Sequence, residues 1–344
     1  MDKKSVGHAL CVLNLPFILI YLLLLGSSTN AKYNIKYTRS IELSSSQKLI
    51  SDTRLSNDIE PLSYILDLRP DIESSSFSGS IKINLTWKDE TKIIELHAHN
   101  ELEIDETNVK IRRLDENKAH VEQEPQYLDI KRTDRIPRRH NFLIYLQEAL
   151  GNGSKCELQI NFKGQIWENT EGLFKSSYIN ESGSKVYYLA TQNRPNFARK
   201  LFPCFDEPSF KVPFAVSISR PMNYTTLFNS DLLSSEEISD RAGYVLDHFE
   251  ATKPMPTYSF GFIISEMQKV FTNITEVQQP KIQVWARKAF HDDLDVIYEK
   301  VSITLKSLQN YWNTSFPLKK LDIVAAPSLF VVKPIDNWGL IILK

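Results

Sequence analysis

Apolar side chains recur at every second position in many short stretches of this chain. Residues 64–68 and 81–87 show this period, which is typical of a strand with one buried face. Similar runs follow at residues 92–97, 142–146, 156–162, 186–190 and 259–264. Gly, Asn, Asp and Pro separate these runs. Short, regular strands with one polar face predict a large antiparallel β-sandwich or saddle over residues 58–267.

The pattern changes near residue 268. One more strand is predicted at residues 282–286, and then apolar residues recur at intervals of three and four from Leu294 to Asn313. Pro317 ends this amphipathic helix, and a buried strand begins at Leu321. Residues 268–344 are therefore predicted to form the α+β start of a second domain, so the whole chain is mainly β.

The N-terminus has the organisation of an export signal. Residues 1–31 combine Lys3 and Lys4, an apolar run and a small-residue end, which predicts a signal peptide cleaved after Ala31. A signal-anchor is the alternative, and Asn14 and Pro16 weaken it as a membrane span. Residues 32–57 are polar and Ser-rich, as in a flexible stalk.

Asn-x-Ser/Thr glycosylation motifs support export independently. They stand at Asn84, Asn152, Asn180, Asn223, Asn273 and Asn313. A glycoprotein that is secreted or lies on the outer face of the plasma membrane is expected. The membrane would be a partner only if the N-terminal segment stays uncleaved.

Composition excludes some partners. The chain has 344 residues, enough for two domains, and a net charge of −1. No nucleic-acid partner is expected, and the basic stretch 131–139 is interpreted as a solvated loop because Asp134 and Pro137 interrupt it. Cys156 and Cys204 are interpreted as buried thiols. A disulfide between them is the alternative if the compartment is oxidising.

Common catalytic patterns are missing from the sequence. There is no Gly-x-Ser-x-Gly, no P-loop, no Cys-x-x-Cys and no His-Glu-x-x-His. His97 and His99 would lie on one face of a strand, but no third metal ligand is evident, so ordinary strand histidines are the better interpretation. No catalytic residue and no metal ligand are assigned.

Several motifs together resemble the aminopeptidase N family of zinc metallopeptidases. They are Phe77-Ser78-Gly79-Ser80-Ile81, Leu96-His97-Ala98, Thr191-Gln192, the run from Ala198 to Pro208 (ARKLFPCFDEP), Pro254-Met255-Pro256-Thr257-Tyr258 and Asp336-Asn337-Trp338-Gly339-Leu340. The resemblance extends from about Leu55 to the end of the chain.

This resemblance implies a β-saddle domain followed by the start of a thermolysin-like domain. In active members a Gly-Ala-Met-Glu-Asn strand holds the substrate, its Glu binds the free α-amine, and a Gln in the first domain lines the same pocket. The family's zinc is held by His-Glu-x-x-His and a further Glu, downstream of that strand. Zinc therefore belongs to the full-length family, and no cofactor is expected in this chain.

The site residues transfer only in part. Gln192 matches the pocket glutamine, and Asp336 and Asn337 stand at the positions of the Glu and Asn, so these three are interpreted as a vestigial substrate site. Arg194 stands where the family often has Glu or Gln, and a fixed cation there would repel an ammonium group. Asp is one methylene shorter than Glu, and misplacement by about 1 Å can cost roughly a hundredfold in rate.

Other residues of the motifs depart from the family or have a structural role. Lys333 and Pro334 replace Gly and Ala, which adds bulk and removes a backbone N–H. Arg199, Asp206 and Glu207 are interpreted as a structural ion-pair network and not as catalytic groups.

Three functions remain open from the sequence. The first is a non-catalytic aminopeptidase N homologue with at most vestigial peptide binding. The second is the N-terminal part of an active zinc aminopeptidase, from an incomplete gene model or a short transcript. The third is a glycosylated interaction module. The helices that normally cover the second domain are missing, which predicts an exposed apolar patch and hence a homodimer or another partner.

Overall fold

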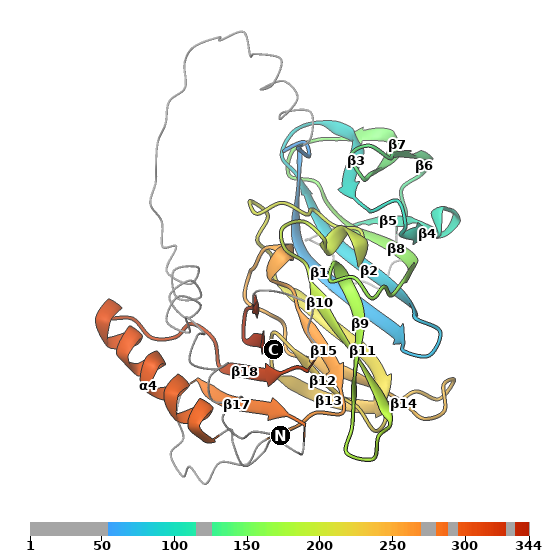
Figure 1. The fold of residues 1–344 in the computed structure, drawn as a ribbon. Coiled ribbons are helices and arrows are strands. Elements are labelled where there is room, and N and C mark those ends of the chain that lie inside the picture. The colour runs from blue at the N-terminus through green and yellow to red at the C-terminus, as the bar shows by residue number, and fades with distance from the viewer. Residues whose placement is uncertain (1–53, 115–125, 270–279, 288–294, 328–333, 344) are drawn as a thin grey trace.

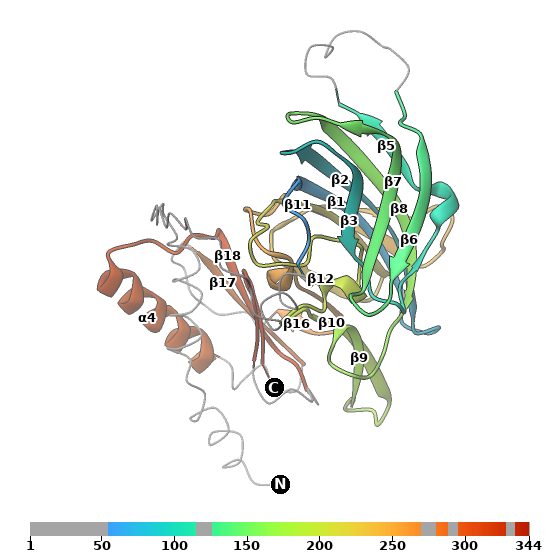
Figure 2. The same ribbon diagram turned by 90° about the horizontal axis from the view of Figure 1, so that it is seen from above.

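The described residues of the computed structural model are 54–114, 126–269, 280–287, 295–327 and 334–343. Strands dominate, as predicted, and they form four sheets (Figures 1 and 2). Among these residues, no helix combines the length and the apolarity needed to cross a membrane. The predicted signal peptide and most of the predicted stalk lie outside the described residues.

The largest sheet is eight-stranded and runs in the order β13-β14-β11-β1-β2-β8-β4, with β5 also paired to β8. Its strands are β1 (Ile59–Asp71), β2 (Ser76–Trp87), β4 (Glu103–Ile104), β5 (Lys110–Arg113), β8 (Lys155–Gln165), β11 (Phe214–Pro221), β13 (Leu232–Glu237) and β14 (Tyr244–Phe249). Its ladders are antiparallel except for β1 with β11. Buried and half-buried residues alternate along β2, which confirms the strand predicted at residues 81–87.

Two smaller sheets complete the first domain. The three-stranded sheet has the order β3 (Thr91–His97), β7 (Asn141–Leu150) and β6 (Ile130–Ile136), and the four-stranded sheet has the order β12 (Thr225–Phe228), β15 (Phe262–Ser265), β10 (Lys185–Gln192) and β9 (Gly172–Ile179). The basic stretch expected to be a loop is in part a strand. Residues 131–135 belong to β6, whose pairing with β7 places the Arg132 guanidinium 3.9 Å from the centre of the Tyr145 ring.

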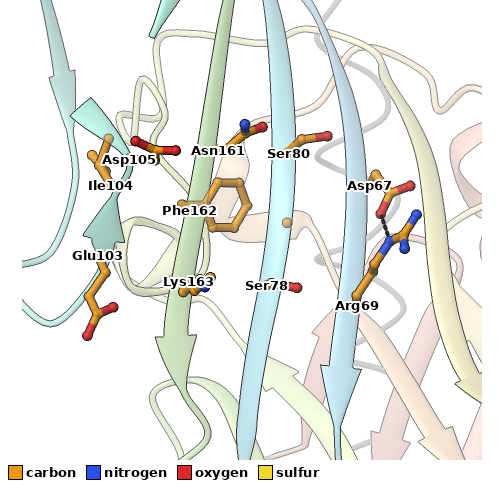
Figure 3. Close-up of a pocket in the computed structure, with 11 residues that line it drawn as sticks. Asp67, Arg69, Ser78, Ser80, Glu103, Ile104, Asp105, Asn161, Phe162 and Lys163 are labelled. Atoms are coloured by element: carbon orange, nitrogen blue, oxygen red, sulfur yellow. Dashed lines mark hydrogen bonds and ion pairs between the residues drawn. The ribbon is translucent and has the colours of Figure 1, made fainter. Parts of the chain in front are cut away.

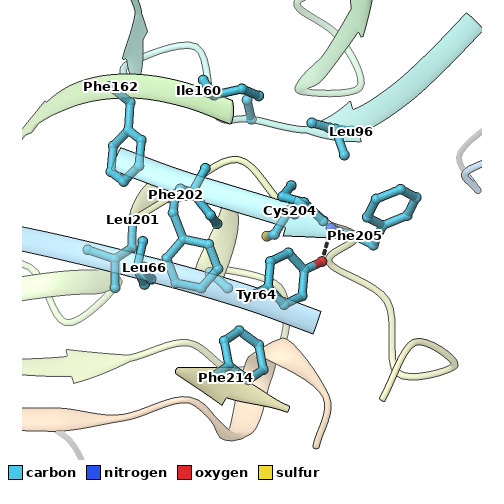
Figure 4. Packing of buried hydrophobic residues seen from close by; sticks show 14 of the residues in the cluster. Tyr64, Leu66, Leu96, Ile160, Phe162, Leu201, Phe202, Cys204, Phe205 and Phe214 are labelled. Carbon is cyan, nitrogen blue, oxygen red and sulfur yellow. Dashed lines mark hydrogen bonds between the residues drawn. The ribbon is translucent and has the colours of Figure 1, made fainter. Parts of the chain in front are cut away.

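The core of the first domain is rich in aromatic rings. Tyr64 of β1 stacks on Phe214 of β11 with ring centres 4.8 Å apart, and its hydroxyl accepts the backbone N–H of Phe205 at 3.0 Å (Figure 4). Cys156 and Cys204 are both buried free thiols, as predicted, and burial raises the pKa of Cys156 to about 11. Leu55 is the first described residue along the chain whose side chain is buried in this core.

The second unit is a five-stranded sheet covered by a helix. The strand order is β16 (Gln268–Lys269), β17 (Lys281–Ala286), β18 (Lys320–Ala325), β20 (Leu340–Leu343) and β19 (Ile335–Asn337). The predicted helix is α4 (Asp295–Trp312), which lies along one face of this sheet (Figure 2). Its residues Tyr298, Val301 and Leu305 share a buried cluster with the strands. The unit therefore has the predicted strand–helix–strand arrangement, with β17 and β18 parallel.

The other face of the five-stranded sheet packs on the four-stranded sheet of the first domain. Val324, Leu340 and Ile342 share a buried cluster with Tyr188 of β10 and Ile263 of β15. The first domain thus covers this face of the described strands, which do not contribute to the exposed apolar patch that was predicted for the second unit. The exposed large apolar side chains of the described part of this unit lie on α4, at Val296, Ile303 and Tyr311.

A buried ion pair also holds the two units together. Lys320 of β18 lies 2.5 Å from Asp322 and donates to the carbonyl of Phe228 in β12 at 2.6 Å and to that of Gly339 at 3.1 Å. Asp322 also accepts from Gln283 and Trp285, each at 2.9 Å. Both charges are thus compensated by several polar partners, as a buried pair requires. The bond from Lys320 to Phe228 ties the central strand β18 of the second unit to the first.

Candidate functional site

The site predicted from the sequence lies where β10 ends beside the edge strand β19. Gln192 is the last residue of β10, and Asp336 is the central residue of β19. Strand β19 forms a hairpin with β20 through Trp338 and Gly339. Gly339 has φ +70°, which favours glycine, and a Cβ there would overlap the carbonyl oxygen of Asn229. The tight turn is therefore fixed by both backbone conformation and space.

The hairpin leaves one edge of β19 without a strand partner among the described residues. Asn337 and Leu340 pair across the two-residue turn, so Asp336 and Ile341 form the next pair of the ladder. Since hydrogen-bonded and non-hydrogen-bonded pairs alternate in an antiparallel ladder, the backbone N–H and C=O of Asp336 point away from β20. Asp336 thus presents a carboxylate and a backbone edge in the same place.

Arg194 binds both groups of Asp336. Its Nη1 lies 3.1 Å from Oδ1 of Asp336, and its Nη2 donates to the backbone carbonyl of Asp336 at 3.4 Å. The side chains are 27% and 16% exposed, so the pair lies at the rim and not in the core. The sequence predicted a cation near an ammonium site, and the structure places that cation in direct contact with the carboxylate.

An aromatic ring completes the surroundings of the guanidinium. The Cζ atom of Arg194 lies 5.1 Å from the centre of the Tyr258 ring, within the range of a cation–π interaction. Tyr258 belongs to a short 3₁₀ helix, Thr257–Ser259, in the Pro-Met-Pro-Thr-Tyr motif. The sequence motif alone gives Tyr258 no role, because nothing local links it to residue 194.

Burial dominates the electrostatics of Asp336. Burial raises the pKa of its carboxyl above the ordinary value, and the Arg194 guanidinium lowers the pKa again without cancelling that shift. The ion pair therefore does not fully replace the water that Asp336 loses on folding. A carboxylate in this state gains from any well-placed cation.

The other two predicted residues lie around this pair in different ways. Gln192 is half-buried, and its Oε1 lies 3.5 Å from the backbone N of Arg194, at the limit of a hydrogen bond. Asn337 is only 1% exposed and packs against Gly261, where a Cβ would overlap its side chain. Asn337 therefore lies between the two units.

Asn229 was missed by the sequence analysis. Its Nδ2 donates to the carbonyls of Ser259 (2.8 Å) and Trp338 (2.7 Å), and its Oδ1 accepts the N–H of Gly261 (2.8 Å). Asn229 thus joins the Tyr258 segment to the β19–β20 turn. An Asn in the polar segment Asn229-Ser230-Asp231 between two strands reads as an ordinary turn residue and gives no sequence signal for this role.

Arg199 and Asp206 form an ion pair, as predicted, and the pair lies in the core. Asp206 accepts from Nε of Arg199 at 2.9 Å and from the Thr257 hydroxyl at 2.6 Å, and its backbone N–H donates to Nδ1 of His97 at 3.2 Å. Glu207 accepts the N–H of Leu55 at 2.7 Å and pairs with Arg54 at 3.1 Å. These contacts confirm a structural network that ties the Ala198–Pro208 run to distant segments.

His97 belongs to this structural network. It is buried at the end of β3, and burial together with the nearby Arg199 lowers its pKa to about 3. His99 instead stacks on His140, with ring centres 4.3 Å apart. Strand β3 ends at His97, so the prediction that His97 and His99 share one face of a strand is wrong, and the two side chains have separate packing roles.

Comparison with known proteins places the chain among the same relatives by two independent matches. The family model of the peptidase M1 N-terminal domain matches residues 60–259, a range that contains Gln192, Arg194 and Asp206. Rat (Rattus norvegicus) aminopeptidase N is 28% identical over 300 residues, which cover 84% of this chain and 30% of the relative. Human (Homo sapiens) endoplasmic reticulum aminopeptidase 1 is 29% identical over 290 residues, 83% of this chain and 29% of the relative.

The chain belongs to the peptidase M1 family. The predicted resemblance and the mainly β fold are confirmed. Rabbit (Oryctolagus cuniculus) aminopeptidase N is similarly related, with 30% identity over 299 residues. The chain spans about 30% of the length of the curated relatives that it matches. Asp336 lies beyond the matched N-terminal domain, on the second unit.

The metal implied for the peptidase M1 family by the sequence resemblance does not fit the residues in hand. Within the part of the chain that the structure describes, no group of three or more His, Cys, Asp and Glu side chains is placed to hold a metal ion. The sequence also lacks His-Glu-x-x-His.

The predicted glycosylation sites differ in exposure. Asn152, Asn223 and Asn313 are exposed, whereas Asn84 and Asn180 are half-buried. Asn84 lies on the central strand β2 and donates to the Ser63 hydroxyl at 2.9 Å. Asn273 lies outside the described residues. Glycosylation at all of these positions stays a prediction.

A polar pocket lies apart from this site, on the outer face of the eight-stranded sheet. It has a volume of about 580 Å³ and lies over β1, β2, β8 and β4 (Figure 3). Ser78 and Ser80 line it, together with the paired Asp67 and Arg69. None of its lining residues belongs to the Arg194–Asp336 site.

Proposed function

We propose that this chain is a secreted or cell-surface aminopeptidase N-like protein that does not by itself hydrolyse peptides. The observation that carries the proposal is the double contact of Arg194 with Asp336. A peptide that added to the β19 edge would need the outward carbonyl of Asp336, and its free amine would need the carboxylate. Arg194 competes for both groups.

The replacement of Gly-Ala by Lys333-Pro334 supports the same proposal. Pro334 precedes β19 and has no N–H to donate to a bound strand. Lys333 lies outside the described residues, and its bulk remains a sequence argument. At most a vestigial capacity for peptide binding is proposed for Gln192, Asp336 and Asn337.

Export is proposed from the N-terminal segment and the glycosylation motifs. The exposure of Asn152, Asn223 and Asn313 is compatible with glycan attachment. A homodimer or another protein partner is proposed only through the exposed apolar side chains of α4.

A second candidate is the N-terminal part of an active zinc metalloaminopeptidase that removes N-terminal residues from peptides. It is favoured by the observation that the chain spans about 30% of the length of its curated relatives, among them aminopeptidase N of the rat and the rabbit. In that case the zinc ligands and the catalytic base would be supplied by sequence other than this chain. A transcript that continues into a His-Glu-x-x-His reading frame would establish this candidate.

The experiment is an aminopeptidase assay of the purified full chain. Amino-acyl chromogenic substrates are incubated with the chain in the presence of added zinc, with rat aminopeptidase N as positive control. We expect turnover no higher than in buffer with zinc. Turnover that follows the chain through purification and that a chelator abolishes would overturn the proposal.

A further inference from the structure

The polar pocket on the outer face of the eight-stranded sheet has a floor of short side chains between longer ones. Ser78 and Ser80 of the central strand β2 form this floor (Figure 3). Their ladder partners on β1 and β8 carry longer polar side chains, at Asp67, Arg69, Asn161 and Lys163. Residues that stand opposite one another in a ladder project to the same face of the sheet. The polar pocket is therefore a trough along β2, and its volume of about 580 Å³ lies within the range that is usual for ligand pockets.

The hydrogen-bonding groups at the bottom of the polar pocket are free. Ser78, Ser80 and Asn161 are half-buried, and their side chains make no hydrogen bond with any residue that the structure describes. The positions on either side of the two serines on this face of β2 differ. Ser76 shares a hydrogen bond with a neighbouring serine at 2.8 Å, and Asn84 donates to a serine hydroxyl at 2.9 Å. Unused donors and acceptors are thus concentrated at the floor of the polar pocket.

The charges around this floor nearly cancel. Three carboxylates and two cations line the polar pocket. Asp67 pairs with Arg69 at 3.2 Å, and Glu103 stands opposite Lys163 in the ladder of β4 with β8. The third carboxylate, that of Asp105, accepts hydrogen bonds from its own loop. A strongly charged ligand therefore gains little net attraction, and the polar pocket suits a neutral ligand that is rich in hydrogen-bonding groups.

We propose that the polar pocket binds a neutral oligosaccharide, with Ser78, Ser80 and Asn161 as its hydrogen-bonding floor. A hydroxyl both donates and accepts, and the Asn161 amide also offers both kinds of group, so sugar hydroxyls match this floor. The exposed side chains of Arg69 and Lys163 bound the polar pocket on β1 and β8, and their CH₂ stems offer apolar surface to the faces of a sugar ring. The proposal goes beyond the proposed function, because this surface is separate from the Arg194–Asp336 site.

The spacing of the strands fits a sugar ring. Neighbouring strands lie about 4.8 Å apart, so the side chains of β1 and β8 stand about 10 Å apart across β2. Ser78 and Ser80 are two residues apart, which is about 7 Å along the strand. A sugar ring that lies over β2 is therefore within reach of both hydroxyls and of the Asn161 amide at the same time.

The oligosaccharide has two sources that experiment can distinguish. Asn84, a predicted glycosylation site, lies on the same face of β2 and four residues from Ser80, which is about 13 Å along the strand. A glycan attached at Asn84 would enter the polar pocket from the same chain. The alternative source is another glycan-bearing molecule.

The test measures binding of two neutral oligosaccharides, mannopentaose and triacetylchitotriose, by calorimetric titration. The full chain and its variant Asn84→Gln are both produced in a host that attaches N-glycans. We expect Asn84→Gln to bind at least one probe saturably. Equal binding by the wild-type chain assigns the ligand to another molecule, whereas binding by Asn84→Gln alone assigns it to the Asn84 glycan. Asn84→Gln that binds neither probe would overturn the proposal.

Two further variants, each made in the Asn84→Gln chain, locate the bound probe. Ser78→Val together with Ser80→Val removes both hydroxyls, and valine suits a strand. The affinity should fall about tenfold, as expected for the loss of two ordinary hydrogen bonds. Ser234→Val is the matched control, because it removes an exposed hydroxyl on edge strand β13 of the same sheet, outside the polar pocket. An equal loss in both, or none in a folded Ser78→Val, Ser80→Val chain, would overturn the proposal.

Discussion

Two arginine–aspartate pairs, whose arginines lie five residues apart in the chain, have opposite environments. Arg199 and Asp206 are 11% and 1% exposed, and Asp206 also has Thr257 and His97 as partners. Arg194 and Asp336 are 27% and 16% exposed, and their surroundings are a backbone edge and the Tyr258 ring. The first pair joins segments of one core. The second spans the junction of two units.

This difference indicates what each pair does. A buried pair with a full set of hydrogen bonds contributes to the fold, because loss of one partner leaves an uncompensated charge in the core. A rim pair contributes little to stability, but it occupies groups that a ligand could use. We therefore assign Arg199–Asp206 to structure and Arg194–Asp336 to specificity.

The largest expected effect is the loss of the Asp206 charge. Asp206→Asn leaves the buried Arg199 guanidinium uncompensated, which should lower the free energy of unfolding by about 3–5 kcal/mol. Urea denaturation followed by tryptophan fluorescence measures this change. The same substitution at Asp336 is the matched control. If the two variants lose equal stability, the distinction between the pairs is wrong.

A smaller effect is expected at the contact between the units. In Gly261→Ala, the new Cβ would overlap the Asn337 side chain, so β19 must shift away from the first domain. Overpacking of this kind costs about 1–3 kcal/mol. Denaturation measures the cost, and Gly151→Ala is the control because a Cβ at residue 151 would meet nothing within 4 Å. Equal stability of both variants would contradict the close packing of Asn337 on Gly261.

The smallest effect is expected for Asp336→Asn, and it should depend on pH. Because the folded-state pKa of Asp336 is raised, the folded chain binds more protons than the unfolded chain as pH passes through the carboxyl range. The contribution of Asp336 to stability therefore falls as pH rises through that range. The side chain introduced by Asp336→Asn cannot ionise. The stability of this variant relative to the wild-type chain should therefore rise between acidic and neutral pH.

At neutral pH the stability of Asp336→Asn should lie within about 1 kcal/mol of wild type. Denaturation at several pH values measures the difference. A variant that loses stability relative to wild type as pH rises would show that the ion pair outweighs burial.

Local pattern predicted the elements well. Apolar residues alternate along β2 and recur every three or four residues along α4, because each element buries one face. Both patterns involve only residues that are close in the sequence, so the sequence alone predicts them. Arg194 and Asp336 were both named from the family motifs, but their contact joins residues 142 positions apart, which no local period encodes. The same holds for Asn229, for the parallel pairing of β1 with β11, and for the burial of the second unit's strands by the first domain.

The most direct test of the account is the pKa of Asp336 with and without Arg194. Carbon-detected NMR titration of aspartate carboxyl groups gives this value, and the resonance missing from Asp336→Asn assigns it. We predict a pKa above the ordinary aspartate value in the wild-type chain and a higher one in Arg194→Ala, because burial remains while the nearby guanidinium is lost. An unchanged pKa in a folded Arg194→Ala would contradict the claim that Arg194 fills this site.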